Sequence, residues 1–305
     1  MTLTSDDGIM ETQYHDEIVP YLKAFLTPAS LEEQTRFGRI KCCNVSRSLY
    51  CSECYSLLVP QSHWPLKLQT SDAKSMLLPF NLCVVLHDRR KSATGLHAAV
   101  LDKANQTHQV TVVDIERGEP MPQFKANDGT YLLFPSPDSV PLASAATSIS
   151  TLVVLDCKWT RSSSRDHASI SNLPKVHLTN PPVESNYWRW HNAGSGMLST
   201  MEAVYVAAKE VSAALSIGED SDYLALLWLF ALQRAAILRH TQVQLREPPF
   251  TDAGKEEQRA LRRQRGTEKQ NRHAHDALVQ LQKHARPAAK KPRWCSELLT
   301  YVDKR

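Results

Sequence analysis

The stretch Thr151-Leu-Val-Val-Leu-Asp-Cys-Lys-Trp159 decides the fold of this 305-residue chain. Its first five residues are β-branched or aliphatic, and a short apolar run of this kind predicts a strand buried in a sheet. The run ends at Asp156, so an acidic side chain follows the strand directly. Cys157, Lys158 and Trp159 then predict a polar loop that carries an aromatic ring.

Three apolar runs upstream repeat this pattern of strand and turn. They cover residues 82–86, 109–115 and 131–134. The first and third run straight into polar or proline-rich loops, at 87–91 and 135–139. Ligands of open α/β sheets bind beyond the carboxyl ends of the strands. These two loops, together with the acidic loop described above, are therefore expected to form a site.

The pattern becomes helical further along the chain. Ser199 and Glu202 have the spacing of a capping box, and an apolar-periodic stretch follows over 201–215. Gly218 ends it, and a second helix is expected over about 223–239. Strands that alternate with helices predict an α/β fold. The sequence has no GxGxxG or GxxxxGKS loop, which disfavours dinucleotide and P-loop sites.

The composition is that of an ordinary globular domain, with 42% apolar and 22% charged residues. It excludes a wholly disordered, collagen-like or coiled-coil chain. The longest apolar run, 224–232, is too short to span a bilayer, so no membrane partner is expected. The acidic N-terminal stretch lacks the apolar core of a secretory signal. We therefore expect an intracellular protein, in the nucleus, the cytoplasm or both.

Positive charge is concentrated near the C-terminus. Residues 255–293 hold twelve Lys and Arg against four acids, a net charge of +8, whereas the whole chain carries +4. Such a segment is typical of an arm that binds polyanions, and a solvated helix explains it equally well. Arg262, Arg263 and Arg265 are its candidate RNA contacts, although these residues also fit a nuclear-import signal.

Four of the seven cysteines lie close together, at Cys42, Cys43, Cys51 and Cys54. Their clustering, the odd total and the missing secretory signal favour a metal over disulfides. Two close pairs suit a structural zinc ion with four thiolate ligands. A three-ligand site and a cluster of reduced cysteines are the alternatives.

Three other features suggest ligand chemistry, each with a simpler alternative. Asp156 fits a general base and Trp159 a ring that stacks on a base or a sulfonium, or they are a helix cap and a core residue. The aromatic run 187–191 suits base stacking, or a core with one arginine at its edge. Ser199 and Thr200 open a helix whose amides could hold a carboxylate or phosphate, and capping alone also explains them.

In this order, the segments resemble the DTW-domain family of tRNA-uridine aminocarboxypropyltransferases, and its eukaryotic branch in particular. The resemblance covers about residues 39–240. It is carried, in chain order, by the cysteine segment 43–55, His87 with 92–98, 134–137, 156–159, 187–189 and 198–203. Two positions depart from the family pattern: Lys158 replaces the threonine of Asp-x-Thr-Trp, and Ile40 stands where a cysteine is usual, with Cys42 nearby.

The resemblance implies a sheet with flanking helices like that of the knotted RNA methyltransferases, preceded by a small zinc-binding element. It implies transfer of the 3-amino-3-carboxypropyl group of S-adenosylmethionine to N3 of a uridine in tRNA, with release of 5′-methylthioadenosine. tRNA is the implied partner, and no obligate protein partner is inferred. Competing interpretations are a non-catalytic RNA-binding zinc protein on a decayed enzyme fold, which Lys158 favours, and an rRNA-directed or methyl-transferring enzyme of the same superfamily.

The resemblance also assigns residues. Asp156 and Trp159 would be catalytic, and Lys158 and Arg189 would contact RNA. The implied S-adenosylmethionine contacts are His87, Thr94, Phe134, Pro135, Ser136, Leu155, Leu198, Ser199 and Thr200. The expected organisation is a lead-in interrupted by Pro20 and Pro28 (1–38), a cysteine-rich zinc element (39–60), the catalytic α/β domain (61–248) and a basic arm (249–305).

Overall fold

The computed structural model describes residues 7–69, 78–124, 128–157, 168–182, 185–188, 197–217 and 223–241. All of them belong to a compact unit of the chain that spans 1–243. The domain boundary predicted at 248–249 lies outside the described residues.

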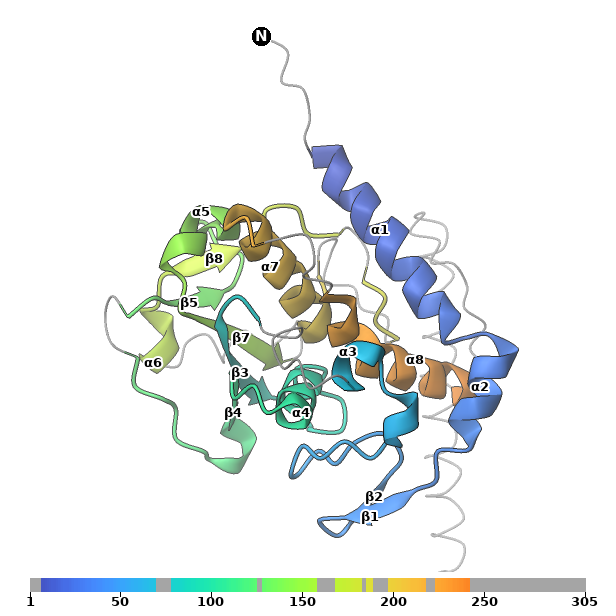
Figure 1. Cartoon of the computed structure of the whole chain (residues 1–305). Helices are drawn as coiled ribbons and strands as arrows, with labels where there is room; N and C mark the ends of the chain where they lie inside the picture. The colour runs from blue at the N-terminus through green and yellow to red at the C-terminus, as the bar shows by residue number, and fades with distance from the viewer. Residues whose placement is uncertain are drawn as a thin grey trace, which may run out of the picture. The chain divides into compact units, whose positions relative to one another are not determined.

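A six-stranded sheet, with all its paired strands parallel, forms the centre of this unit (Figure 1). Its strand order is β4-β3-β7-β5-β8-β6. The strands are β3 (Asn81–His87), β4 (Val110–Asp114), β5 (Thr130–Leu133), β6 (Val140–Pro141), β7 (Thr151–Cys157) and β8 (Lys175–His177). A separate antiparallel hairpin pairs β1 (Ile40–Cys42) with β2 (Val45–Arg47).

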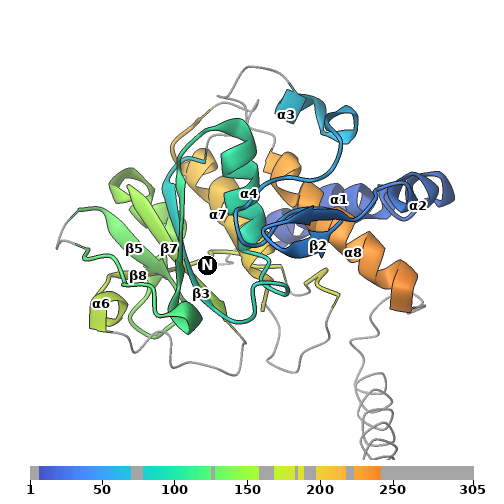
Figure 2. The ribbon, with the colours of Figure 1, turned by 90° about the horizontal axis from the view of Figure 1, so that it is seen from below.

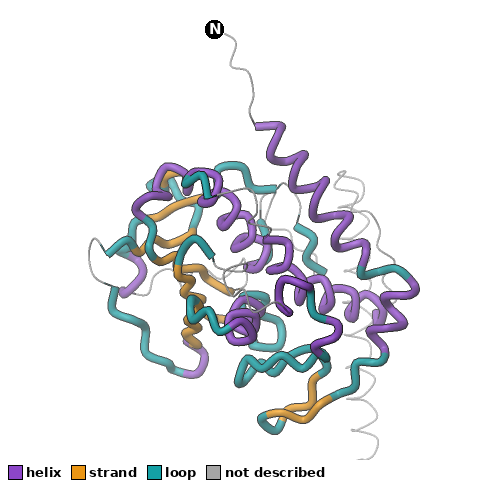
Figure 3. Tube along the Cα trace, in the orientation of Figure 1, coloured by secondary structure: helices purple, strands orange, loops and turns teal. Residues whose placement is uncertain are grey.

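Helices surround the sheet, as Figure 3 shows. The α-helices are α1 (Asp7–Ala24), α2 (Pro28–Thr35), α3 (Leu66–Gln69), α4 (Leu96–Asn105), α5 (Leu142–Ala145), α6 (Ala168–Ser171), α7 (Thr200–Ala214) and α8 (Trp228–Thr241). Short 3₁₀ turns are η1 (Gln61–His63), η3 (Ile115–Arg117), η4 (Ala146–Ser148) and η6 (Tyr223–Leu227). The predicted α/β class, a parallel sheet with flanking helices, is confirmed.

Both faces of the sheet are buried. Leu82 and Val84 of β3 point into the main core, which includes residues of α4 and α7. Cys83 and Val85 point the other way, into a second core that includes Ile170 of α6. Figure 2 shows α4 and α7 on one side of the sheet and α6 on the other. Because neighbouring strand residues face opposite sides, a strand buried on both faces reads as an uninterrupted apolar run.

The four predicted strands and the two C-terminal helices are present close to the predicted positions. The sequence predicted only strands and turns before residue 160, and this is wrong for Leu96–Asn105, because α4 follows β3 there. The expected break at Pro20 is also wrong, because α1 continues through it. Ile18 and Leu22, on either side of Pro20, are 0% and 2% exposed in the main core, and this packing outweighs the hydrogen bond that a proline removes.

The apolar run 224–232 lies in η6 and the start of α8. Leu227, Leu229 and Phe230 are completely buried, so the run belongs to the core of the domain. Within the described part of the chain, no helix combines the length and the apolar character needed to cross a membrane.

The start of α7 is organised by a buried glutamate. Glu202 and Ser199 form the predicted capping box, and both side chains are buried. The Glu202 carboxylate also accepts hydrogen bonds from Ser185 Oγ at 2.5 Å and Asn186 N at 2.7 Å. Glu202 therefore fixes both the N-terminus of α7 and a segment that precedes it in the chain.

Replacing this glutamate should destabilise the domain. Glu202→Ala leaves several buried donors without an acceptor, and we expect the free energy of unfolding to fall by about 3 kcal/mol. Urea titration of both proteins measures the change. Glu32→Ala, at an exposed position of α2, is the control and should stay within about 0.5 kcal/mol of the native protein. An equally small change for Glu202→Ala would contradict this role.

Candidate functional site

The sheet brings the three predicted loops to one edge. Strands β3, β7 and β5 are neighbours and run parallel, so their carboxyl ends emerge together. Leu86 of β3 lies opposite Asp156 of β7, and His87 lies opposite Cys157. The loop after β5 begins at Phe134. The pattern of three strands that end in polar loops therefore corresponds to one continuous edge.

Asp156 is the buried acid of this edge, with 7% of its surface exposed. Its Oδ2 accepts a hydrogen bond from Gly95 N at 2.5 Å, and the Thr200 side chain provides another. Burial raises the pKa of Asp156 to about 6, because the hydrogen bonds from Gly95 and Thr200 offset the loss of water only in part. The negative charge of Asp88 raises it further.

Gly95 makes this contact possible through close approach. A Cβ atom at this position would lie 2.7 Å from Asp156 Oδ2 and 2.8 Å from Val84 Cγ1. Its φ of −60° is open to any residue, so the requirement is space rather than backbone conformation. The start of α4, the end of β7 and the start of α7 consequently meet around one carboxylate.

The start of α7 uses most of its polar groups internally. Ser199 N donates to Glu202 Oε2 at 3.0 Å, and Glu202 N donates to Ser199 Oγ at 3.4 Å. Met201 N donates to Thr94 Oγ1 at 3.3 Å, so the predicted ligand residue Thr94 lies buried against this helix. Leu198 is buried as well. Capping accounts for these contacts of Ser199, and Thr200 is the residue of this group that reaches Asp156.

The proline loop after β5 has a defined shape. Phe134 N donates to Val176 O at 2.8 Å, which holds the start of the loop beside β8. Ser139 Oγ donates to Ser136 O at 2.7 Å and lies 2.8 Å from His177 Nδ1. Ser136 Oγ is buried, and hydrogen bonds from Lys175 and then from the Ser136 hydroxyl lower the pKa of Asp138 to about 2. Pro135 is exposed, so this position of the loop is accessible to a ligand.

His87 and Leu155 also lie on this edge. His87 ends β3, and its Nε2 lies 3.1 Å from Glu116 Oε1. Leu155 precedes the buried acid on β7 and is half-buried against the second core. His97 is different: it is completely buried, its Nε2 lies 2.6 Å from Gln233 Oε1, and burial lowers its pKa to about 4. His97 is therefore a neutral core residue.

Several predicted site residues fall outside the described residues. These are Lys158, Trp159, Arg189, Arg262, Arg263 and Arg265, and their roles stay predictions. In the aromatic run, Tyr187 and Trp188 are described. The rings of Trp188 and Phe230 lie 5.4 Å apart, so this end of the run packs on the core.

The four clustered cysteines come together as predicted. The Sγ atoms of Cys42, Cys43, Cys51 and Cys54 all lie within 4.8 Å of one another. A tetrahedral zinc site with Zn–S bonds of about 2.3 Å places its sulfurs about 3.8 Å apart. The Cys42–Cys54 and Cys42–Cys43 Sγ distances are 3.5 and 4.0 Å. This donor set therefore has the dimensions and the chemistry of a four-thiolate zinc site.

Two tight turns create this cluster. Cys43 and Asn44 have positive φ angles of 48° and 63° in the β1–β2 turn. Tyr55, directly after the CxxC pair, has a φ of 59°. The left-handed backbone conformation turns each chain segment back on itself. The adjacent pair Cys42-Cys43 can thus meet a CxxC pair although its own spacing is unusual.

The thiols perturb one another strongly. Hydrogen bonds from Ser56 lower the pKa of Cys54 to about 6. Hydrogen bonds with Cys54 and Cys51 raise the pKa of Cys42 to about 12. Four neighbouring thiols without a cation cannot all ionise, whereas a divalent metal stabilises every thiolate at once.

Arg90 fastens the cysteine element to the sheet. Its Nε donates to Ser52 O and its Nη1 to Asp114 Oδ2, both at 2.9 Å, and its Nη2 donates to the Tyr55 hydroxyl. One guanidinium thus connects the CxxC loop with the end of β4. Sequence reasoning missed the roles of Arg90 and Gly95, because neither differs in pattern from its neighbours in the loop.

A parallel α/β sheet whose carboxyl edge carries a buried carboxylate of raised pKa has the arrangement with which α/β proteins bind ligands. The chain belongs to the DTW domain family, which matches residues 48–238. This family is that of the tRNA-uridine aminocarboxypropyltransferases, and membership supports an aminocarboxypropyl transferase activity.

Comparison with curated proteins gives no match. Among solved structures, the SAM-dependent rRNA:acp-transferase Tsr3 from Vulcanisaeta distributa is similar, at 17% sequence identity and a TM-score of 0.29. The match covers 59% of this chain and 96% of that chain.

The cysteine cluster should retain a metal through purification. We expect about one zinc ion per chain, measured by elemental analysis, and loss of most of it in Cys54→Ser. Cys83→Ala is the matched control, since Cys83 is a buried free cysteine outside the cluster. A Cys54→Ser protein with undiminished zinc content would exclude the cluster as the metal site.

The raised pKa of Asp156 should make stability depend on pH. Between about pH 4 and 6 the folded state binds more protons than the unfolded state, so stability falls as the pH rises through this window. The loss attributable to Asp156 should approach 3 kcal/mol, as roughly two pKa units imply. Asp156→Asn removes this contribution while its amide oxygen can still accept hydrogen bonds. Parallel stability curves of both proteins in urea from pH 4 to 7 would refute the assignment.

Proposed function

We propose that this protein transfers the 3-amino-3-carboxypropyl group of S-adenosylmethionine to N3 of a uridine in tRNA. Family membership supports the type of transfer. The observation that carries the proposal is the position of Asp156: a buried carboxylate with a raised pKa, at the carboxyl end of a central strand of the sheet.

The reaction is a nucleophilic substitution at carbon. N3 of the uridine attacks the carbon of the aminocarboxypropyl chain that is bonded to sulfur, and a new N–C bond forms. The C–S bond breaks, and its electron pair stays on sulfur, which gives 5′-methylthioadenosine. The proton from N3 must leave as the bond forms, and Asp156 is the proposed acceptor.

The environment of Asp156 suits this role. A carboxylate with a pKa near 6 is ionised at neutral pH, yet it is a stronger base than a solvated one, and general bases work best with a pKa near the working pH. Gly95 and Thr200 fix its orientation, and a carboxylate has lone pairs to accept a further proton donor. These contacts therefore position Asp156 and leave it able to accept a further hydrogen bond.

The remaining predicted residues complete the proposal. The loop of Phe134, Pro135 and Ser136 would contact S-adenosylmethionine, and the exposed Pro135 is accessible for such a contact. Trp159 would pack on the transferred chain or the sulfonium. A zinc ion held by the four thiolates would have a structural role, because all four of its positions are occupied by protein. An unpaired uridine is the fitting acceptor, since N3 is hidden in a base pair.

The test is a transfer assay with S-adenosylmethionine labelled in its aminocarboxypropyl carbons and unmodified tRNA. The native protein should label the tRNA and release 5′-methylthioadenosine. Asp156→Asn should lower the rate by about 10²- to 10⁴-fold, as expected for a lost general base. Asp16→Asn, at an exposed position of α1, should leave the rate unchanged.

Each other outcome selects a different conclusion. If the label enters rRNA but not tRNA, the substrate is rRNA. If a labelled methyl group is transferred instead, the protein is a methyltransferase. An Asp156→Asn protein with the native rate would remove Asp156 from the mechanism. Binding of tRNA without binding of S-adenosylmethionine would favour a non-catalytic RNA-binding protein.

A further inference from the structure

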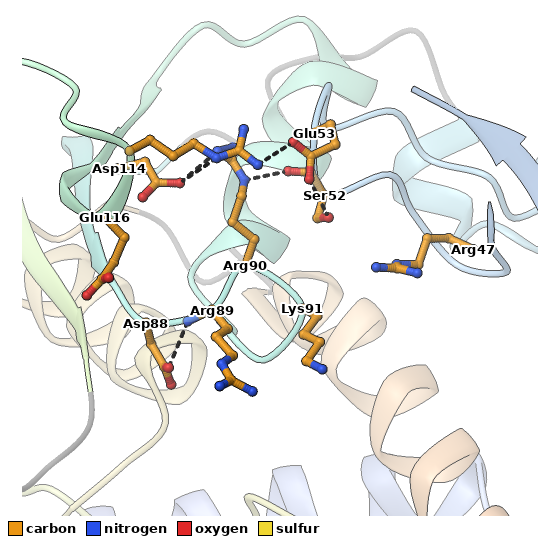
Figure 4. A pocket seen from close by; sticks show the side chains of 10 residues that line it. Arg47, Ser52, Glu53, Asp88, Arg89, Arg90, Lys91, Asp114 and Glu116 are labelled. Atoms are coloured by element: carbon orange, nitrogen blue, oxygen red, sulfur yellow. Dashed lines mark hydrogen bonds and ion pairs between the residues drawn. The ribbon is translucent and has the colours of Figure 1, made fainter. Parts of the chain in front are cut away.

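A cavity of about 480 Å³ opens beside the site, and no step of the proposed reaction uses it. Figure 4 shows the side chains that line it. Its walls come from the cysteine element, the loop between β3 and α4, and the end of β4. The lining residues are Arg47, Ser52 and Glu53, then Asp88, Arg89, Arg90 and Lys91, and finally Asp114, Glu116 and Arg117.

The acids of this cavity have basic or backbone partners. Asp114 lies 2.9 Å from Arg90 and 3.5 Å from Arg117, measured between carboxylate oxygen and guanidinium nitrogen. Glu53 lies 2.6 Å from Arg117. Glu116 pairs with His87 at the end of β3. Asp88 accepts a hydrogen bond from the backbone Arg89 N at 2.7 Å.

Three cations of the same cavity lack an acidic partner among the described residues. Arg89 and Lys91 are exposed and form no ion pair there. Within the part of the chain that the structure describes, the Arg47 guanidinium donates a hydrogen bond to the Ser46 carbonyl, at 3.1 Å, and to no carboxylate. Figure 4 shows Arg89 and Lys91 extending to the same side of their loop, away from Asp114, while Arg47 points toward that loop from the cysteine element. These three cations give this part of the cavity an excess of positive charge, of which the nearby Asp88 carboxylate offsets one.

We propose that Arg47, Arg89 and Lys91 bind the phosphodiester backbone of the acceptor RNA. This inference rests on the proposed function for the identity of the polyanion. Guanidinium and ammonium groups are the groups proteins use to neutralise phosphates. The location fits, because Lys91 and Arg89 follow β3, the strand that pairs with β7 and places Leu86 opposite Asp156. A strand of RNA bound here would lie close to Asp156, the acid that would accept the proton from N3 of the uridine.

The cations stand on a rigid support. Arg90, between Arg89 and Lys91, is clamped by Ser52 and Asp114, so the loop between β3 and α4 is fixed at its middle. Arg47 belongs to β2, which pairs with the strand that ends at Cys42. The metal site would thus hold one of the three cations in place. A structural metal in this element would therefore contribute to RNA binding by holding Arg47 in position.

The experiment measures how binding of an unmodified tRNA transcript depends on salt. Each lost phosphate contact should reduce the slope of log K against log salt by about 0.7 to 0.9, and lower affinity about fivefold near 0.15 M salt. Arg89→Gln and Lys91→Gln should each show this change. Lys23→Gln, an exposed lysine of α1, removes the same charge and should keep the native slope.

The outcomes separate this inference from the proposed function. Reduced slopes in Arg89→Gln and Lys91→Gln support the phosphate site even if the native protein transfers nothing to the tRNA. Native slopes in both variants overturn it, whatever the transfer assay gives. Loss of S-adenosylmethionine affinity with a native RNA slope also overturns it, because the cations would then serve the carboxylate of the co-substrate. Calorimetry with S-adenosylmethionine measures that affinity on the same full-length proteins.

Discussion

The hydrogen bond from Gly95 N to the buried Asp156 carboxylate ties together parts of the chain that are far apart in sequence. The acid ends β7, its donor begins α4, and its second donor, Thr200, begins α7. Burying a carboxylate costs free energy unless hydrogen bonds replace the lost water, and here they replace it only in part. The shortfall appears as a raised pKa. A domain built for stability alone would gain from removing this carboxylate, so its presence at the carboxyl edge of the sheet favours the chemical role proposed for it.

The cysteine element depends on the same edge. Arg90 lies five residues before Gly95 in the loop between β3 and α4, and it holds the CxxC loop through Ser52 and Tyr55. The Lys103 Nζ of α4 adds a hydrogen bond to Cys54 O at 2.7 Å. The loop between β3 and α4 therefore contacts the cysteine element through Arg90 and positions Asp156 through Gly95 at its end.

Local sequence patterns predicted the features that are determined by residues close together in the chain. The apolar runs predicted the strands, the spacing of Ser199 and Glu202 predicted the cap, and the spacing of the cysteines predicted that the four thiols come together. Contacts between distant segments were not predictable in this way. Nothing near Gly95 indicates that Asp156, 61 residues later, occupies the space of its missing side chain. Helix α4 was not predicted for a related reason. A short, buried apolar sequence is compatible with a strand as well as with a helix.

The order of the strands divides the carboxyl edge into two halves. On the β3–β4 side lie the cysteine element and the cations Arg47, Arg89 and Lys91, and on the β5–β8 side lies the proline loop that begins at Phe134. Strand β7 separates the halves and carries Asp156 at its end. The proposed reaction joins a polyanion and a small zwitterionic sulfonium, which need two different surfaces that meet at the proton acceptor. A central strand flanked by unlike loops suits that arrangement, because the acid at the end of β7 lies between both halves of the edge.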